Sequence, residues 1–236
     1  MVTFTDVERP LAARDVLHRM GQYRRAFPGC SITCPAAVLN SSDVADAVRD
    51  RGQLVDVRSR AELAFVTVLG VPASRLVVHD DGVTAAPLRC AARVGVGRVV
   101  LGCPQQVPVL AQAVARRRQP VLVDTTTALA DCTVAAAAAE PRLDLVGLHA
   151  TLADDAPESA YLGAVAELIA RMAHVRHEWG VILVRVSLSG GSVLCDPDAP
   201  VGALHRLAAG LEDAFDDACA RTRFPRPALT LAPRHG

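Results

Sequence analysis

Short apolar runs alternate with longer amphipathic segments along almost the whole chain. Eight runs rich in Val and Leu have the length of strands, and the segments between them repeat apolar residues every three or four positions, as helices do. Strands that are apolar at nearly every position are typical of a parallel sheet buried on both faces. The predicted strands are 31–40, 53–59, 74–80, 97–103, 120–126, 143–152, 181–191 and 227–233.

A helical segment precedes the first predicted strand, and others separate each strand from the next. Ser, Asp and Pro mark several of their starts, and Gly marks several of their ends. Eight βα units in this length predict an α/β fold, a single (β/α)8 TIM barrel over residues 1–236. An open doubly wound sheet is the alternative, but no G-x-G-x-x-G follows the first strand, where a dinucleotide site would need it. The predicted helices are 10–26, 41–52, 60–70, 84–95, 104–118, 128–140, 158–179 and 201–224.

The charge balance and the choice of basic residue narrow the range of functions. The chain carries 25 basic and 25 acidic residues, and a formal net charge of zero argues against nucleic-acid binding. All 25 basic residues are arginine, and no lysine occurs. A Schiff base requires a primary amine that can lose its proton, and a guanidinium group does not provide one. In this sequence only the N-terminal amine remains for such chemistry.

Cysteine usage and the N-terminus predict a cytoplasmic protein. Seven cysteines are scattered along the chain without a C-x-x-C pair, which favours reduced thiols over a disulfide framework or a zinc site. The N-terminus has early acidic residues and no apolar core, so we do not expect a signal peptide. No uncharged apolar stretch reaches the ~20 residues of a membrane span, so we expect no membrane partner.

Several stretches resemble, in order, motifs of the fold-type III pyridoxal-phosphate-dependent decarboxylases, and of diaminopimelate decarboxylase in particular. The stretch "LVDVRSRAEL" is similar to F-D-V-x-S-x-x-E-L, and "LDLVGLHATLADD" is similar to L-V-G-L-H-x-H-I-G-S. The stretch "VSLSGGSVLCDPDAP" resembles D-L-G-G-G-L-G-x-x-Y-x-x-D-x-P, and "ALTLAPRHG" resembles L-x-x-E-P-G-R. The resemblance covers nearly the whole chain, and it implies the barrel of the alanine racemases and these decarboxylases, which binds pyridoxal phosphate.

The departures from these motifs fall on the residues that carry the family's chemistry. Counting along the chain from the matched motifs places Ala37 where the family has the lysine that holds the cofactor. Thr151 stands in place of the histidine that stacks on the cofactor ring, and Ala232 in place of the glutamate that pairs with the pyridine nitrogen. Ser187 and Ser189 replace the Asp and the first Gly of D-L-G-G-G. The functional positions that still match the motifs are His149, Gly190, Gly191 and Pro233.

The resemblance and these departures together predict a non-catalytic pseudoenzyme that binds a partner protein or a small phosphate-bearing ligand. We expect no covalent cofactor, although pyridoxal phosphate or phosphate could bind without a covalent bond at the glycine-rich turn, where backbone N–H groups can cradle an anion. Family members carry a second, mostly β domain, which we do not expect in this chain. They also form dimers, which implies a homodimer or a heterodimer with an active decarboxylase homologue, and an exposed apolar patch where the partner packs. The residues predicted for the ligand site are His149, Ser189, Gly190, Gly191 and Ser192.

Two enzymatic alternatives remain open. In one, the chain serves a diaminopimelate- or amino-acid-decarboxylase role in trans with another chain. In the other, Cys103, Asp124 and His149, which end three adjacent predicted strands, bind a metal or activate a thiolate without a cofactor. Cys34, at the end of the first strand, is a further candidate nucleophile.

Overall fold

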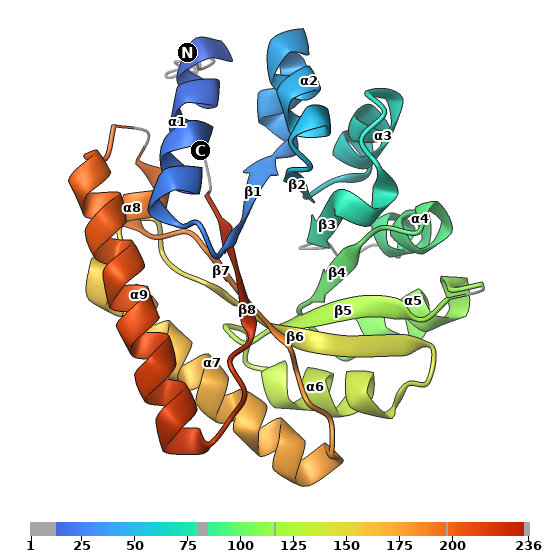
Figure 1. Cartoon of the computed structure of the whole chain (residues 1–236). Helices are drawn as coiled ribbons and strands as arrows, with labels where there is room; N and C mark the ends of the chain where they lie inside the picture. Colours follow the sequence, from blue (N-terminus) through green and yellow to red (C-terminus); the bar gives the residue numbers. More distant parts are fainter. Residues whose placement is uncertain (1–12, 80–84, 116, 197, 234–236) are drawn as a thin grey trace, which may run out of the picture.

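The computed structural model describes residues 13–79, 85–115, 117–196 and 198–233, which form a closed barrel. Eight parallel strands pair in chain order, and the last strand pairs with the first, which confirms the predicted (β/α)8 fold. Figure 1 shows the strands at the centre of the molecule and the helices around them. The strands are β1 (Ser31–Pro35), β2 (Leu54–Val57), β3 (Leu76–His79), β4 (Arg98–Leu101), β5 (Gln119–Asp124), β6 (Leu143–Thr151), β7 (Arg185–Ser189) and β8 (Ala228–Ala232).

The helices follow the predicted order, and the first of them begins within the predicted range 10–26, of which residues 10–12 lie outside the described residues. Within the described part of the chain, no helix is long and apolar enough to cross a membrane. The helices are α1 (Ala13–Ala26), α2 (Ser42–Asp50), α3 (Arg60–Val68), α4 (Ala86–Val94), α5 (Gln106–Ala113), α6 (Ala130–Ala139), α7 (Glu158–Trp179), α8 (Ser192–Cys195) and α9 (Val201–Thr222).

Three local predictions were wrong. The first strand ends at Pro35 rather than at residue 40, because proline has no N–H to donate to the ladder, and a 3-10 turn, η1 (Ala36–Asn40), follows it. The helix predicted over 104–118 ends at Ala113, because Val114 takes an extended conformation and turns the chain toward β5. The short helix α8 was not predicted at all, since four residues are too few for a periodic pattern.

Side chains on alternate strand positions divide between the barrel interior and the layer beneath the helices. The large core cluster contains Val99 and Leu101 of β4 together with the buried faces of the helices. Val100, between them, belongs to a separate small cluster inside the barrel. The interior at this level is filled by apolar side chains from four adjacent strands, namely Val77, Val100, Leu122 and Val146.

The helix α1 covers the junction at which the barrel closes. It precedes β1 in the chain, yet it packs between α9 and α2, so it lies over the seam of β8 and β1 (Figure 1). Arg19 of α1 is buried, and its guanidinium donates hydrogen bonds of 2.8 Å to the carbonyl oxygens of Ala199 and Asp196. The Tyr23 hydroxyl donates to the carbonyl of Leu194 at 2.9 Å. These bonds attach α1 to the end of α8 and to the segment that leads into α9.

Candidate functional site

Polar side chains line the upper part of the barrel interior, toward the mouth at which the strands end. On one side, Thr33 Oγ1 donates a 2.6 Å hydrogen bond to Asp56 Oδ2, and Asp56 Oδ1 lies 3.2 Å from His79 Nε2. All three side chains are buried, with at most 5% of each residue exposed. A buried carboxylate is costly unless it accepts hydrogen bonds, and Thr33 and His79 supply them.

The opposite side of the interior holds a second polar group centred on His149, which has no exposed surface. Its Nδ1 lies 3.0 Å from Ser187 Oγ, and its Nε2 lies 3.1 Å from Thr151 Oγ1 and 3.3 Å from Ser189 Oγ. The two groups meet at the histidines, because the rings of His79 and His149 pack edge to face with centroids 5.1 Å apart. We call these seven residues the polar belt: Thr33, Asp56, His79, His149, Thr151, Ser187 and Ser189.

The predicted lysine and glutamate positions follow β1 and end β8, and both carry only methyl groups. Ala37 is exposed in η1, directly after β1. Ala232 is buried at the end of β8, opposite Ser189 of β7. The belt supplies hydroxyl, imidazole and carboxylate groups, but no primary amine. It can hold and transfer protons, and it cannot form an imine.

The glycine turn (residues 189–192) folds as a tight connection between β7 and α8. Gly190 and Gly191 have φ angles of 79° and 82°, which residues other than glycine rarely adopt. The amide of Gly191 donates to the carbonyl of Ala153 at 3.1 Å. The amide and the hydroxyl of Ser192 both donate to the carbonyl of Ala156, at 3.0 and 2.9 Å. An anion at this turn would have to displace the loop between β6 and α7 from these donors.

Tyr161 of α7 fills the space beneath the same turn. Its hydroxyl donates to the carbonyl of Gly190 at 2.9 Å and accepts a hydrogen bond from the amide of Leu194 at 3.2 Å. The side chain is fully buried, and burial raises the pKa of its phenol. A Cβ atom on Gly191 would overlap the phenol, so the glycine is required by this packing as well as by its φ angle.

The structure brings together only part of the predicted ligand site. Ser189 and His149 are joined in the polar belt, whereas Gly191 and Ser192 direct their amides to the loop outside the barrel. The predicted Cys/Asp/His set is not assembled either. Asp124 and His149 are neighbours in the β5–β6 register, but Asp124 Oδ1 accepts hydrogen bonds from the amide and hydroxyl of Thr126. Among the residues of the described ranges, no group of three His, Cys, Asp or Glu side chains is placed to hold a metal ion.

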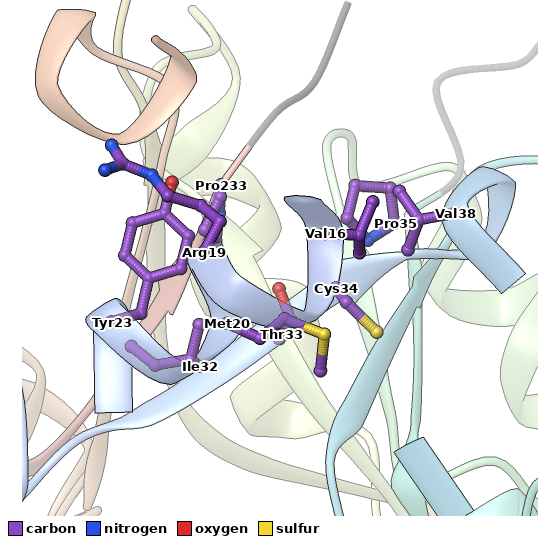
Figure 2. A pocket seen from close by; sticks show the side chains of 10 residues that line it. All are labelled: Val16, Arg19, Met20, Tyr23, Ile32, Thr33, Cys34, Pro35, Val38 and Pro233. Atoms are coloured by element: carbon purple, nitrogen blue, oxygen red, sulfur yellow. The ribbon is translucent and has the colours of Figure 1, made fainter. Parts of the chain in front are cut away.

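The predicted nucleophile Cys34 faces away from the polar belt, toward the helical layer. Its thiol is buried and lies 3.5 Å from the carbonyl of Leu54, and burial, with a smaller contribution from the charge of Asp56, raises its pKa. Figure 2 shows the hollow on this side of β1, bounded by Arg19 and Tyr23 of α1. Its volume of about 10 Å³ has room for about one water molecule, so it is not a substrate pocket.

Comparison with known proteins then decides the family. Residues 13–140, more than half of the chain, match the family model described as "Pyridoxal-dependent decarboxylase, pyridoxal binding domain". The chain belongs to this family. It is 27% identical over 241 residues to the diaminopimelate decarboxylase of Actinosynnema pretiosum subsp. auranticum, an alignment that covers 91% of this chain and 54% of that protein. The diaminopimelate decarboxylase of Corynebacterium efficiens is 27% identical over 180 residues, with coverage of 64% and 39%.

Solved structures of pyridoxal-dependent decarboxylases share the fold. The diaminopimelate decarboxylase of M. jannaschii superposes with a TM-score of 0.80 at 12% identity, over 94% of this chain and 59% of that one. The lysine decarboxylase of Selenomonas ruminantium gives a TM-score of 0.75 at 22% identity, over 94% and 59%. This decarboxylase-family chain therefore spans about half the length of the relatives it matches.

The residues of this family member do not fit a covalently held pyridoxal phosphate. A cofactor of this kind needs an amine for its imine and an acidic partner for its ring nitrogen. The positions that the motifs predict for these groups are Ala37 and Ala232, and the polar belt offers no amine in their place. The amides of Gly191 and Ser192 already have protein acceptors. No catalytic step through the cofactor follows from this arrangement.

Sequence reasoning found His149 and the serines of β7, but it missed Thr33, Asp56 and Tyr161 as members of the site. Thr33 and Asp56 carried a signal, because each interrupts an apolar strand with a polar side chain on one face. Tyr161 carried no such signal in the sequence, since its position in α7 is also consistent with an ordinary core residue. Only the fold brings it to the turn 29 positions later in the chain.

Replacing Tyr161 with Phe should destabilise the protein by about 1–2 kcal/mol, because the carbonyl of Gly190 loses a donor while the ring still fills the space beneath the turn. The free energy of unfolding is measured in urea. Hydrogen exchange of the Leu194 amide should quicken in the same variant, since this amide loses the phenol oxygen as an acceptor. An unchanged stability and an unchanged exchange rate at Leu194 would show that the phenol does not hold the turn.

Cys34 should resist thiol reagents in the folded protein. Because burial raises its pKa, its thiolate is scarce at pH 8, whereas Cys132 is exposed. Timed labelling followed by peptide mapping should find Cys132 modified early and Cys34 modified only after unfolding. In a Cys132→Ser variant the early phase should disappear. Fast labelling of Cys34 in the native state would restore it as a candidate nucleophile.

Proposed function

We propose that this chain is a non-catalytic member of the pyridoxal-dependent decarboxylase family and acts by binding a partner protein. The observation that carries the proposal is a chain without lysine, with Ala37 where the motifs predict the family's cofactor-holding lysine. Without an imine the cofactor cannot serve as an electron sink for decarboxylation. A cytoplasmic location is part of the proposal, because all seven cysteines are free thiols.

Exposed apolar side chains support an interface. Val68 and Val94 are the last residues of the neighbouring helices α3 and α4, and they are 86% and 38% exposed. Phe65, one turn before Val68 on α3, is 38% exposed. Large apolar residues grouped at the surface are typical of protein-binding sites. The partner we propose is a second copy of this chain or an active decarboxylase homologue.

Ligand binding at the glycine turn is the second version of the proposal. His149 and Ser189 lie on the strands that lead to this turn and already hydrogen-bond to each other, and a phosphate would compete with the loop carbonyls that now accept from Gly191 and Ser192. The occupied amides favour the partner-binding version. A decarboxylase role in trans remains the enzymatic alternative, and it requires another chain to supply the amine.

Incubation with pyridoxal phosphate followed by borohydride reduction should leave the side chains of the purified protein unmodified. Ala37→Lys should gain a reducible adduct that peptide mapping places at residue 37. An Ala64→Lys variant adds the same amine to an exposed position of α3 and is the matched control, which should require more pyridoxal phosphate for the same labelling. A side-chain adduct in the unaltered protein, or release of CO2 from diaminopimelate by it, would refute the non-catalytic assignment.

Association should depend on the apolar surface of α3 and α4. Sedimentation of the protein, alone and with a purified diaminopimelate decarboxylase, should detect a dimer that Val68→Asp weakens by about tenfold or more, because a charge placed in an apolar interface loses its hydration. Ala209→Asp, at an exposed position of α9, should leave association unchanged. Both variants should keep the thermal midpoint of the parent. If the protein stays monomeric both alone and in the presence of the decarboxylase, the partner-binding proposal is refuted.

A further inference from the structure

Two arginines face the barrel interior at the end opposite the mouth, which we call the N-terminal opening. Arg98 begins β4 and lies two positions before Val100, which packs inside the barrel. Arg185 begins β7 and lies two positions before Ser187, which bonds to His149 inside the barrel. Since side chains two apart on a strand share a face, both guanidinium groups point inward.

The electrostatic environment of Arg98 agrees with this placement. Burial, as the main cause, and then the charge of Arg185 lower the pKa of Arg98 to about 10, while the charge of Asp56 opposes the shift. Strands β2, β4 and β7 are not neighbours in the closed barrel. The residues on them therefore influence one another across the interior.

Neither arginine is neutralised by a direct partner within the described part of the chain, where no hydrogen bond or ion pair reaches either guanidinium. Asp56 of β2 shares the register level of Arg98 through Val77. Asp144 of β6 alternates with outward-facing residues. Within the described ranges neither carboxylate forms an ion pair with the two arginines. Both arginines are only partly buried, so solvent reaches them. Two like charges share this space, and the charge of Asp56 offsets that of Arg98 only in part, since the pKa of Arg98 is still lowered.

The strands beside Arg185 present little or no side chain at its level. Its register partners are Gly147 on β6 and Ala228 on β8, so one neighbouring strand presents no side chain and the other only a methyl group. The register partner of Arg98 on β3 is the apolar Val77. None of these three residues competes for the donors of the two guanidinium groups, whose planar forks match the oxygen atoms of a carboxylate or a phosphate.

We propose that the N-terminal opening of the barrel is an anion-binding site, in which Arg98 and Arg185 together hold the phosphate or carboxylate group of a small molecule. The site is at the other end of the barrel from the glycine turn and does not depend on the proposed lack of catalysis. The bound anion adds to the partial compensation that Asp56 gives to Arg98. Its negative charge reduces the repulsion between the two arginines, so each one strengthens binding by the other.

The test follows the arginine side chains directly. Protein labelled with 15N-arginine is titrated with inorganic phosphate against chloride at matched ionic strength, and the Nε–H resonances are recorded. The resonances of Arg98 and Arg185 should shift together and saturate with phosphate, and that of Arg206, an exposed arginine on α9, should not. Arg98→Gln should weaken the response of Arg185 by about tenfold or more. Arg206→Gln is the matched control and should leave that response unchanged.

Three results would overturn the proposal. One is the lack of any saturable shift at Arg98 and Arg185, and another is an equal shift at Arg206, which would indicate general ionic effects. The third is saturable phosphate binding seen only in the backbone amides of Gly190, Gly191 and Ser192, which would place the anion at the mouth. The titration of the unaltered protein tests the proposal even if a variant fails to fold. A second titration with acetate separates carboxylate from phosphate recognition.

Discussion

Closure of the sheet into a barrel constrains every polar group that the strands direct inward. Eight strands share one narrow interior, so a buried carboxylate on β2 must find its partners on β1 and β3, and Asp56 does so with Thr33 and His79. The same requirement joins His149 to the hydroxyls of Thr151, Ser187 and Ser189 on its own and the next strand. The polar belt is thus a self-satisfied network, and any ligand that enters it must offer at least as many hydrogen bonds.

The glycine turn illustrates how a motif can persist while its hydrogen bonds serve the fold. Gly190 and Gly191 keep the conformation that the connection from β7 to α8 needs. The donors of the turn are directed to the loop after β6, and Tyr161 of α7 bonds to it from below. Conformation and packing give these glycines a structural reason to be present, whether or not an anion binds.

The sequence was sufficient for the fold and for part of the site. Apolar runs predicted all eight strands, because a parallel sheet buried on both faces leaves a strong local signal. The motifs predict Ala37 and Ala232 at positions where the family has its lysine and glutamate, and this assignment stays a prediction. The sequence could not reveal the bonds from Arg19 to Asp196 or from Tyr161 to Gly190, since each joins residues far apart in the chain and has no local pattern. The end of the first strand at Pro35 was readable, because proline lacks the donor that the ladder needs.

The seam between β8 and β1 has a consequence for how the molecule is made. Its register pairs Ser31 with Thr230, so the first strand to leave the ribosome stays without one neighbour until the last strand has been synthesised. The helix α1 covers this seam and reaches its contacts with α8 and α9 equally late. Pairings between such distant residues slow folding and prolong the exposure of an unpaired strand edge. For this barrel, the growing chain is most vulnerable to aggregation before β8 has been made.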